Sequence, residues 1–234
     1  MTKNVLVTGG NRGIGFEIVK GMLSKGYKVL MGCRDEESGL EAKKELVGGD
    51  LHVIEMPLDN ETAIVDAFVR AEAVFGPIDI LINNAGVLDD TPWQEVNAEL
   101  LAKSMQVNVY APLTLIQQTL PQMIERGFGR IINVSSSYGS FAEELKGPFS
   151  YAISKAAVNA LTVKMAAAVD EAANGEPLDV TVNSMTPGWV HTRMGGSDAP
   201  KTPEEGADTA IWLATMEKGG PHGQFLKDRK SIDW

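Results

Sequence analysis

Tyr151 and Lys155, in the run Tyr-Ala-Ile-Ser-Lys, are the two residues whose types and spacing best suit acid–base chemistry. Side chains four residues apart lie on one face of an α-helix. A phenol with an ordinary pKa of about 10 transfers protons poorly at neutral pH. An ammonium group one turn away favours the phenolate and lowers that pKa. The pair therefore predicts a proton-transfer site, although the same spacing also occurs in exposed helical pairs.

Polar residues in two other segments could complete such a site. Three serines, Ser135, Ser136 and Ser137, follow an expected buried strand, and a serine hydroxyl there could hydrogen-bond a substrate carbonyl oxygen. The residues themselves leave open which serine does so. Asn108 stands inside an expected helix, where asparagine has poor propensity, so something beyond helix formation should retain it. The alternative is a side-chain hydrogen bond that merely bends the helix.

A glycine-rich loop, TGGNRGIG from Thr8 to Gly15, lies between the first expected strand and the first expected helix. Gly9 permits a tight turn, Gly13 lets the backbone approach a pyrophosphate, and Gly15 lets helix and strand pack closely. The N-terminus of the helix then faces the anion. A purely structural turn could use the same residues, but the position after the first strand favours a dinucleotide site.

The end of the second expected strand, Gly32-Cys33-Arg34, bears on which nicotinamide cofactor fits. An acidic residue here would hold a ribose 2′-hydroxyl and repel a 2′-phosphate. Arg34 and Arg12, the latter in the glycine loop, present two guanidinium groups that suit a phosphate. The neighbouring Asp35 is an acidic residue and would instead favour NADH. Arg34 could also be a solvated residue at a helix start. We predict a preference for NADPH.

An alternation of apolar runs and helical patterns must position these residues. The apolar runs are nearly continuous, which is typical of parallel strands buried on both faces. Strands are expected at Asn4–Thr8, Lys28–Gly32, His52–Met56, Ile78–Asn83, Gly129–Ser135, Asp179–Met185 and Gln224–Leu226. Helices are expected at Gly13–Lys25, Glu36–Val47, Glu61–Phe75, Asn97–Glu125, Tyr151–Ala173 and Pro203–Met216. This order predicts an α/β fold, a doubly wound parallel sheet of Rossmann type in three αβα layers. Such sheets bind ligands at the carboxyl ends of their strands.

Length and composition set the class of protein. The 234 residues, 44% hydrophobic, suit one domain over residues 1–234, because single cores stop growing at about 250–300 residues. The formal net charge of -10 argues against a nucleic-acid partner, which needs a basic face. A lone Cys33 excludes a disulfide framework, and with three scattered histidines we expect no metal site.

Targeting signals are not expected in this sequence. The N-terminal residues lack the basic and apolar regions of a signal peptide. No run reaches the roughly 18 consecutive apolar residues that a membrane helix needs. We therefore expect a cytoplasmic protein without a membrane partner.

Taken together, the motifs from Thr8 to Thr192 resemble the short-chain dehydrogenase/reductase family. The resemblance includes the GxxxGxG spacing and the turn Asn83-Asn84-Ala85-Gly86. It implies four catalytic residues: Asn108, Ser136, Tyr151 and Lys155. Ser136 is chosen because Gly139 follows it by three residues, as in the family. The implied cofactor-binding residues are Gly9, Asn11, Arg12, Gly13, Ile14, Gly15, Arg34, Leu58, Asp59, Asn84, Ala85, Gly86, Tyr151, Lys155, Pro187, Gly188, Val190 and Thr192.

The resemblance also implies specific roles. Lys155 would bond the nicotinamide ribose, and Asn108 would hold a water that links Lys155 to solvent. Asp59 would contact the adenine ring, although from the residues alone it is equally a helix N-cap. Val190 and Thr192, after a Pro-Gly turn, would lie on the carboxamide side of the nicotinamide.

The C-terminal segments narrow the resemblance to the NADPH-dependent carbonyl reductases. They are Pro187–Val190, Met194–Gly196, Thr202–Gly206 and Gly220–Phe225. Animal members carry a long insertion between the catalytic serine and tyrosine that blocks an oligomer face, whereas only Ser137–Ser150 stands here. The resemblance therefore implies an open face and a homodimer or homotetramer. The alanine-rich helix at Tyr151–Ala173 would pack on the sheet or also on a partner subunit.

The implied activity is NADPH-dependent reduction of ketones and aldehydes to alcohols, with Tyr151 as the general acid. Phe141, Phe149, Trp189 and Met194 make the expected rim apolar, which favours hydrophobic or aromatic carbonyl substrates. The first alternative is a reductase dedicated to one metabolite, such as a ketoacyl thioester, a steroid-like ketone or an alkaloid ketone. The second is a cofactor-binding sensor without turnover.

Overall fold

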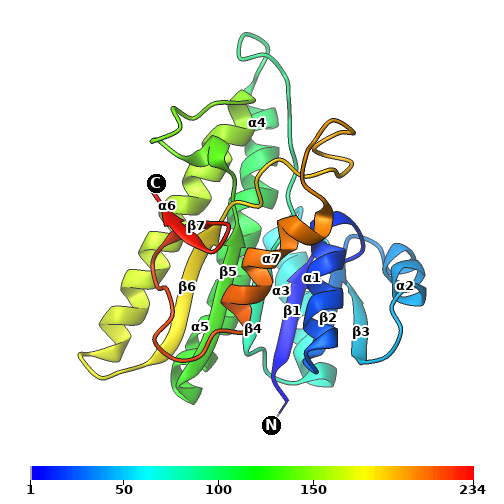
Figure 1. Cartoon of the computed structure of the whole chain (residues 1–234), viewed down its shortest axis with the longest axis vertical. Coiled ribbons are helices and arrows are strands. Elements are labelled where there is room, and N and C mark those ends of the chain that lie inside the picture. Colours follow the sequence, from blue (N-terminus) through cyan, green and yellow to red (C-terminus); the bar gives the residue numbers. More distant parts are fainter. Residues whose placement is uncertain (1) are drawn as a thin grey trace.

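The apolar strand sequences assemble into one eight-stranded sheet in the computed structural model, which describes residues 2–234 (Figure 1). The strand order is β3-β2-β1-β4-β5-β6-β7-β8, and every pairing is parallel except that of β7 with β8. The strands are β1 (Asn4–Thr8), β2 (Lys28–Cys33), β3 (Asp50–Glu55), β4 (Ile80–Asn83), β5 (Phe128–Val134), β6 (Asp179–Met185), β7 (Phe225–Lys227) and β8 (Lys230–Ile232). The predicted doubly wound Rossmann sheet is confirmed, with its order reversing between β1 and β4.

Helices cover both faces of this sheet. They are α1 (Gly13–Ser24), α2 (Glu36–Lys44), α3 (Glu61–Phe75), α4 (Ala98–Met105), α5 (Ala111–Arg126), α6 (Phe149–Ala173) and α7 (Pro203–Ala214). A π-helical turn, η1 (Gln106–Tyr110), separates α4 from α5, and a 3₁₀ turn, η2 (Ser137–Gly139), follows β5. The single helix predicted over Asn97–Glu125 is therefore divided at the turn that carries Asn108.

Two apolar clusters form the core, one on each face of the sheet. Alternate residues of β1 enter opposite clusters: Val5 and Val7 pack with α1 and α7, whereas Leu6 packs with α3, α5 and α6. Because successive side chains of a strand point to opposite faces, burial on both sides requires the continuous apolar strands seen in the sequence. The predicted three-layer αβα arrangement is confirmed.

Helix α6 is the longest element and carries the predicted acid–base pair. Within the described residues it is the one helix whose length and hydropathy would allow it to cross a membrane, since an 18-residue window reaches a mean hydropathy of 1.3. However, 44% of that window is buried inside the structure, and α6 packs against β6. These features are typical of a core helix in a layered α/β protein.

Candidate active site

The first two turns of α6 place Tyr151 and Lys155 in the interior beside the carboxyl end of β5. The Lys155 Nζ lies 5.5 Å from the centre of the Tyr151 ring. It donates a hydrogen bond of 2.8 Å to the carbonyl oxygen of Val134, the last residue of β5. The structure therefore brings the predicted pair together and ties it to the strand end where ligands bind in this fold.

Burial dominates the acidity of both groups. It raises the pKa of Tyr151 to about 12, and an interaction with the Ser136 side chain opposes that rise. Burial likewise lowers the pKa of Lys155 to about 8. The largest cause of both shifts is the same: a dry environment disfavours the charged form of each group. The expectation that Lys155 depresses the tyrosine pKa is not met, because burial raises that pKa and the only opposing effect comes from Ser136.

Of the three neighbouring serines, the structure brings Ser136 to the Tyr151 phenol. Its hydroxyl also accepts a 3.2 Å hydrogen bond from the backbone N–H of Tyr138, which caps η2. Ser135 is buried and donates to the carbonyl oxygen of Lys155 at 3.3 Å. A Cβ on Gly139 would stand 2.4 Å from the Lys155 carbonyl carbon, so a glycine is required where η2 meets α6.

Asn108 lies buried in the π-helical turn, with its amide fully engaged. Its Oδ1 accepts from the Val87 N–H and its Nδ2 donates to the Val87 carbonyl oxygen, both at 2.9 Å. The Nδ2 also donates to Ser154 Oγ at 2.9 Å, which links the turn to α6. A π-helical turn of this kind is frequent at functional sites. Asn108 thus ties the segment after β4 to the helix that carries Tyr151.

Gly86 separates Asn108 from Lys155 at the centre of the site. A Cβ at Gly86 would lie 3.2 Å from Asn108 Oδ1 and 3.5 Å from Lys155 Nζ. The glycine therefore preserves the space between these two polar groups. The structure thus brings Asn108 close to Lys155 of the Tyr151–Lys155 pair, although 42 residues of chain lie between Asn108 and Tyr151.

The glycine loop and the turn after β4 are packed tightly against each other. Asn84 Nδ2 donates to the carbonyl oxygens of Thr8 and Gly9 at 2.9 and 3.1 Å. Thr8 Oγ1 accepts from the backbone N–H groups of Asn84 and Ala85. A Cβ on Gly15 would stand 2.2 Å from the Gly9 carbonyl oxygen. The loop is thus a backbone cradle at the start of α1, which fits a dinucleotide pyrophosphate.

A group of three guanidinium side chains lies beside this cradle. Burial, Arg193 and Arg34, in that order, lower the pKa of Arg12, and Asp35 opposes the shift. Arg193 was not among the predicted site residues; its signal in the sequence is a basic residue directly after Thr192. Arg12 thus has a guanidinium neighbour on each of two other segments, and cations gathered in this way fit an anionic ligand such as a 2′-phosphate or pyrophosphate.

Asp35, the acidic residue expected to disfavour NADPH, is engaged as the N-cap of α2. Its carboxylate accepts from the Ser38 N–H at 2.9 Å and caps α2, and this hydrogen bond lowers the pKa of Asp35. Asn11 also reaches α2, because its Nδ2 donates to Ser38 Oγ at 2.9 Å. The predicted contact residue Asn11 therefore joins the glycine loop to α2.

Cys33 faces the core rather than the end of the strand. Its sulfur lies 2.3 Å from the position that a Cβ on Gly39 would take, and burial raises the pKa of the thiol to about 11. Because side chains alternate along a strand, the exposed residue at this strand end is Arg34.

The residues after β3 separate two interpretations of Asp59. Asn60, not Asp59, caps α3 by accepting from the Ala63 N–H at 2.8 Å. The N-cap interpretation of Asp59 is therefore wrong, and its side chain is exposed. The neighbouring Leu58 offers its carbonyl oxygen to Gln106 at 3.2 Å, which connects this segment to the π-helical turn.

The loop after β6 returns to the glycine loop. Gly188 has a φ of 79°, which a Pro-Gly turn requires, and Val190 beyond it is buried. A Cβ on Gly13 would lie 3.3 Å from Thr192 Cγ2. The structure thus places Thr192 against the cradle, while His191 is exposed.

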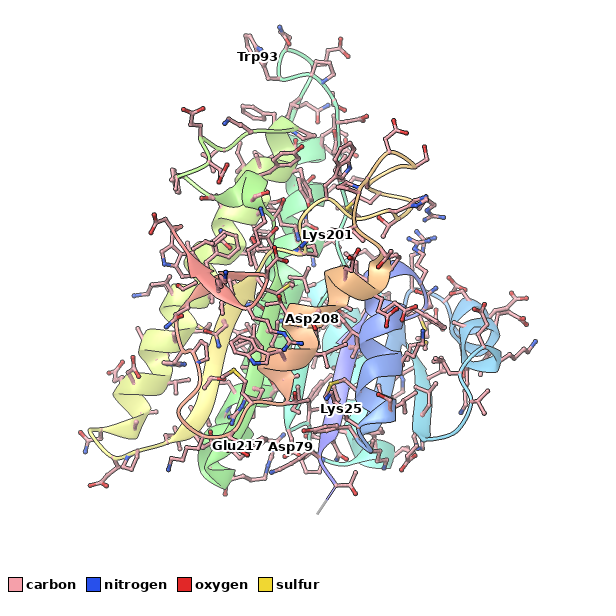
Figure 2. All side chains as sticks on the ribbon, viewed as in Figure 1. Lys25, Asp79, Trp93, Lys201, Asp208 and Glu217 are labelled. Carbon is pink, nitrogen blue, oxygen red and sulfur yellow. The ribbon has the colours of Figure 1, made fainter. Side chains whose placement is uncertain are left out.

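A cavity of about 380 Å³ opens between the segment after β4 and the start of α6. Its lining includes Trp93, Leu145, Phe149 and Ala152, whereas Tyr151 itself is not among the lining residues. Figure 2 shows Trp93 at the tip of the loop before α4. The sequence interpretation missed this loop. Of the four predicted rim residues, Phe149 lines the cavity, whereas Phe141, Trp189 and Met194 are exposed elsewhere.

Comparison with known proteins agrees with this arrangement. The family model described as short chain dehydrogenase matches residues 3–203. Carbonyl reductase [NADPH] 1 of Mus musculus is 31% identical over 98% of this chain and 97% of its own length. That alignment spans 279 positions, so the mouse protein carries residues that this shorter chain lacks. Acetoacetyl-CoA reductase of Rhizobium meliloti (strain 1021) is also 31% identical, over 94% of this chain and 93% of its own.

Solved structures show the same fold along the whole chain. The carbonyl reductase Sniffer of D. melanogaster superposes with a TM-score of 0.86 at 25% identity, covering 100% of both chains. The NADPH-bound carbonyl reductase from chicken fatty liver has a TM-score of 0.82 at 28% identity, covering 100% of this chain and 99% of that one. With its glycine cradle, its Tyr151–Lys155 pair and these matches, the chain belongs to the short-chain dehydrogenase/reductase family.

Proposed function

We propose that this protein is an NADPH-dependent carbonyl reductase that converts ketones and aldehydes to alcohols. The observation that carries the proposal is the meeting of Tyr151, Ser136 and Lys155 at the end of β5, next to the glycine cradle. A proton donor, an oxygen-binding hydroxyl and a buried cation are the groups that carbonyl reduction needs from the protein. The named activities of several relatives support the same chemistry.

In the proposed mechanism, the reduced dinucleotide supplies a hydride to the carbonyl carbon when it is bound. Tyr151 transfers its proton to the carbonyl oxygen. With its pKa near 12 it is neutral at physiological pH, and the alkoxide that develops is a stronger base than phenolate. Ser136 donates a hydrogen bond to the same oxygen as negative charge grows on it.

Lys155 stabilises the phenolate that proton transfer leaves behind. With a pKa of about 8 it is mostly protonated at neutral pH, and its Nζ lies at the Tyr151 ring. In a dry site the attraction between ammonium and phenolate is strong, so it favours proton release. Asn108 positions the surrounding segments, and we assign it the water-holding role that the family resemblance implies.

We propose that NADPH is held along the cradle, with its 2′-phosphate at Arg12 and Arg34. Leu58 and Asp59 would border the adenine, and Asn84, Ala85 and Gly86 would line the ribose. Pro187, Gly188, Val190 and Thr192 would flank the nicotinamide. The tight backbone approach at Gly9, Gly13 and Gly15 and the guanidinium group support this assignment.

Replacing Arg34 with aspartate is expected to raise the KM for NADPH about 10- to 100-fold, because one charge-assisted phosphate contact is lost and a repulsion is added. The KM for NADH should fall, since a carboxylate can hold a ribose 2′-hydroxyl. Steady-state kinetics with both cofactors measure the change. Arg70→Asp, at an exposed position on α3, is the control and should leave both constants unchanged. Equal KM values for NADPH and NADH in the wild-type protein would contradict the assignment.

We propose hydrophobic or aromatic ketones as substrates, on the strength of the apolar cavity at the start of α6, the helix that carries Tyr151. An NADPH-oxidation assay should show higher kcat/KM for activated aryl ketones than for short aliphatic ones. The named activity of the Rhizobium relative makes acetoacetyl-CoA the required competitor in this panel. Selective turnover of that thioester would favour a dedicated metabolite reductase, and binding without NADPH consumption would favour a sensor.

We further propose that the chain forms a homodimer or homotetramer as a cytoplasmic enzyme, with residues 1–234 as one domain. Val163 is exposed on α6, a helix with an apolar 18-residue window of which only 44% is buried inside the structure. Sedimentation equilibrium tests the assembly, and a monomeric mass at micromolar concentration would contradict it.

A further inference from the structure

The β7–β8 hairpin and the residues that follow it touch two loops that border the site. One is the serine loop, defined as residues 137–148, which connects β5 to α6. The other is the Pro-Gly loop, defined as residues 186–201, which follows β6. Figure 1 shows the end of the chain beside the start of α6, and the contacts below join the two regions.

The first set of contacts joins the serine loop to Asp233 and Trp234. The Ala142 N–H donates to the Trp234 carbonyl oxygen at 3.0 Å. Ser140 Oγ, which is fully buried, donates to the Asp233 carbonyl oxygen at 3.2 Å. The Trp234 ring stacks on the buried Phe225 of β7, with centroids 5.6 Å apart and planes inclined by 13°. The stacking thus holds the two acceptor carbonyls in place.

The serine loop is largely exposed beyond Ser140. Glu144 and Leu145 have φ values of 61° and 49°, which is a left-handed backbone conformation that residues other than glycine rarely adopt. Phe141 is 71% exposed, so it provides little packing of its own. Yet Leu145 and Gly147 line the cavity at the start of α6. A strained, sparsely packed segment that forms a binding wall needs contacts from elsewhere to keep one conformation.

The second set of contacts joins the hairpin turn to the Pro-Gly loop. Asp228, in the turn, forms an ion pair with Lys201. Lys201 Nζ lies 3.4 Å from the Pro187 carbonyl oxygen and would be 3.3 Å from a Cβ on Gly188. Lys201 also pairs as a bridge with Val190 through the backbone. The turn therefore reaches the residues proposed to flank the nicotinamide.

Helix α7 anchors the hairpin turn itself. Arg229 pairs with Asp208, and its backbone N–H donates to Thr209 Oγ1 at 3.1 Å. Figure 2 labels Lys201 and Asp208, the partners of the two turn residues. Because α7 packs against α1 and the sheet, the turn is fixed to the core.

We propose that the hairpin with Trp234 is a positioning device that holds the serine loop and the Pro-Gly loop in the conformation that shapes the substrate cavity. Trp234 and Asp228 are its positioning residues; neither touches the reacting atoms. The effect on substrates rests on the proposed function, whereas the effect on loop order does not.

Hydrogen–deuterium exchange of the purified protein tests loop order directly. Trp234→Ala should speed exchange at Ala142 and Leu145 by about tenfold, the loss expected for one aromatic stack. Exchange in the Pro-Gly loop should not change. Asp228→Asn should affect the other loop: exchange should become faster at His191 and Lys201 and stay unchanged in the serine loop. Unchanged exchange in both variants, or equal acceleration throughout the chain, would overturn the proposal.

Matched variants separate positioning from general destabilisation. Asp233→Ala keeps the acceptor carbonyl and should behave as wild type, because the backbone oxygen makes the contact. Trp234→Phe should restore slow exchange. Ser140→Ala removes one contact without altering Trp234, so it tests the same link if Trp234→Ala does not fold. An effect of Asp233→Ala equal to that of Trp234→Ala would contradict the backbone link.

Kinetics supply a readout that a merely structural role would not move. In Trp234→Ala, the KM for a bulky aryl ketone should rise about tenfold, while the KM for a small aldehyde and the Kd of NADPH stay within about twofold. A parallel loss for every substrate and for NADPH would overturn the role in shaping the cavity. Absence of any ketone turnover in the wild type would refute the proposed function, and the exchange result would still stand.

Discussion

Tyr151→Phe is expected to lower kcat/KM for ketone reduction by about 10²- to 10⁴-fold, the range for loss of a general acid. The variant keeps the ring that packs beside Tyr138 and Lys155 and removes only the hydroxyl that faces Ser136. The Kd of NADPH should change by less than about twofold, since the phenol makes at most one of many cofactor contacts. Steady-state kinetics and a fluorescence titration with NADPH measure the two quantities.

The control for this prediction is Tyr27→Phe, at a tyrosine that packs on the core cluster next to α1 and lies outside the site. It removes the same atom and should leave kcat/KM unchanged. Substantial remaining turnover in Tyr151→Phe would refute the assignment of the proton donor. A lost affinity for NADPH would instead show that the hydroxyl mainly serves binding.

Lys155→Met is expected to abolish most turnover and, without ligand, to stabilise the fold. Loss of the cation that favours the phenolate should lower kcat/KM by at least about 10²-fold. Burial holds the pKa of Lys155 near 8, whereas an unfolded lysine titrates near about 10.5. Removing this unfavourable charge, less one hydrogen bond to Val134, should raise the unfolding free energy on the order of 2 kcal/mol at pH 7. Such conflicts between stability and activity are common at functional sites.

The stability difference between Lys155→Met and the wild-type protein should depend on pH. Between pH 8 and about 10.5 the unfolded lysine keeps its proton while the folded lysine has lost it, so wild-type stability rises with pH. Lys155→Met lacks this group, and its stability advantage should therefore be largest below pH 8 and shrink above it. The raised pKa of Tyr151 acts in both proteins above pH 10 and cancels in the comparison.

Denaturant unfolding of both proteins from pH 6 to pH 10 checks this expectation. Lys164→Met, at an exposed lysine on the same helix, is the matched control and should shift the unfolding free energy by less than about 0.5 kcal/mol. A Lys155→Met protein that is less stable than wild type at pH 7 would show that the buried ammonium stabilises the fold through contacts that outweigh its desolvation.

Much of the fold could be predicted because its signals are local. Buried parallel strands require continuous apolar runs, and a tight strand–helix connection requires glycines such as Gly9 and Gly15. Strand β8 was not predicted from the sequence, because it has only three residues, is largely exposed and forms only through its pairing with β7. The π-helical turn escaped prediction because the contacts of Asn108 with Val87 come from another segment.

The sequence by itself determined the family, the order of strands and helices, and the residue types of the site. Only the tertiary structure decided the electrostatics, because desolvation depends on what surrounds a group: Tyr151 and Lys155 are both pushed toward their neutral forms by enclosure, the reverse of the effect predicted for the tyrosine. The tertiary structure also brings together residues whose contact cannot be predicted from their spacing in the sequence. Arg193 joins Arg12 and Arg34, and Trp234 supports a loop more than 80 residues earlier in the chain, because folding returns distant loops to the same edge of the sheet.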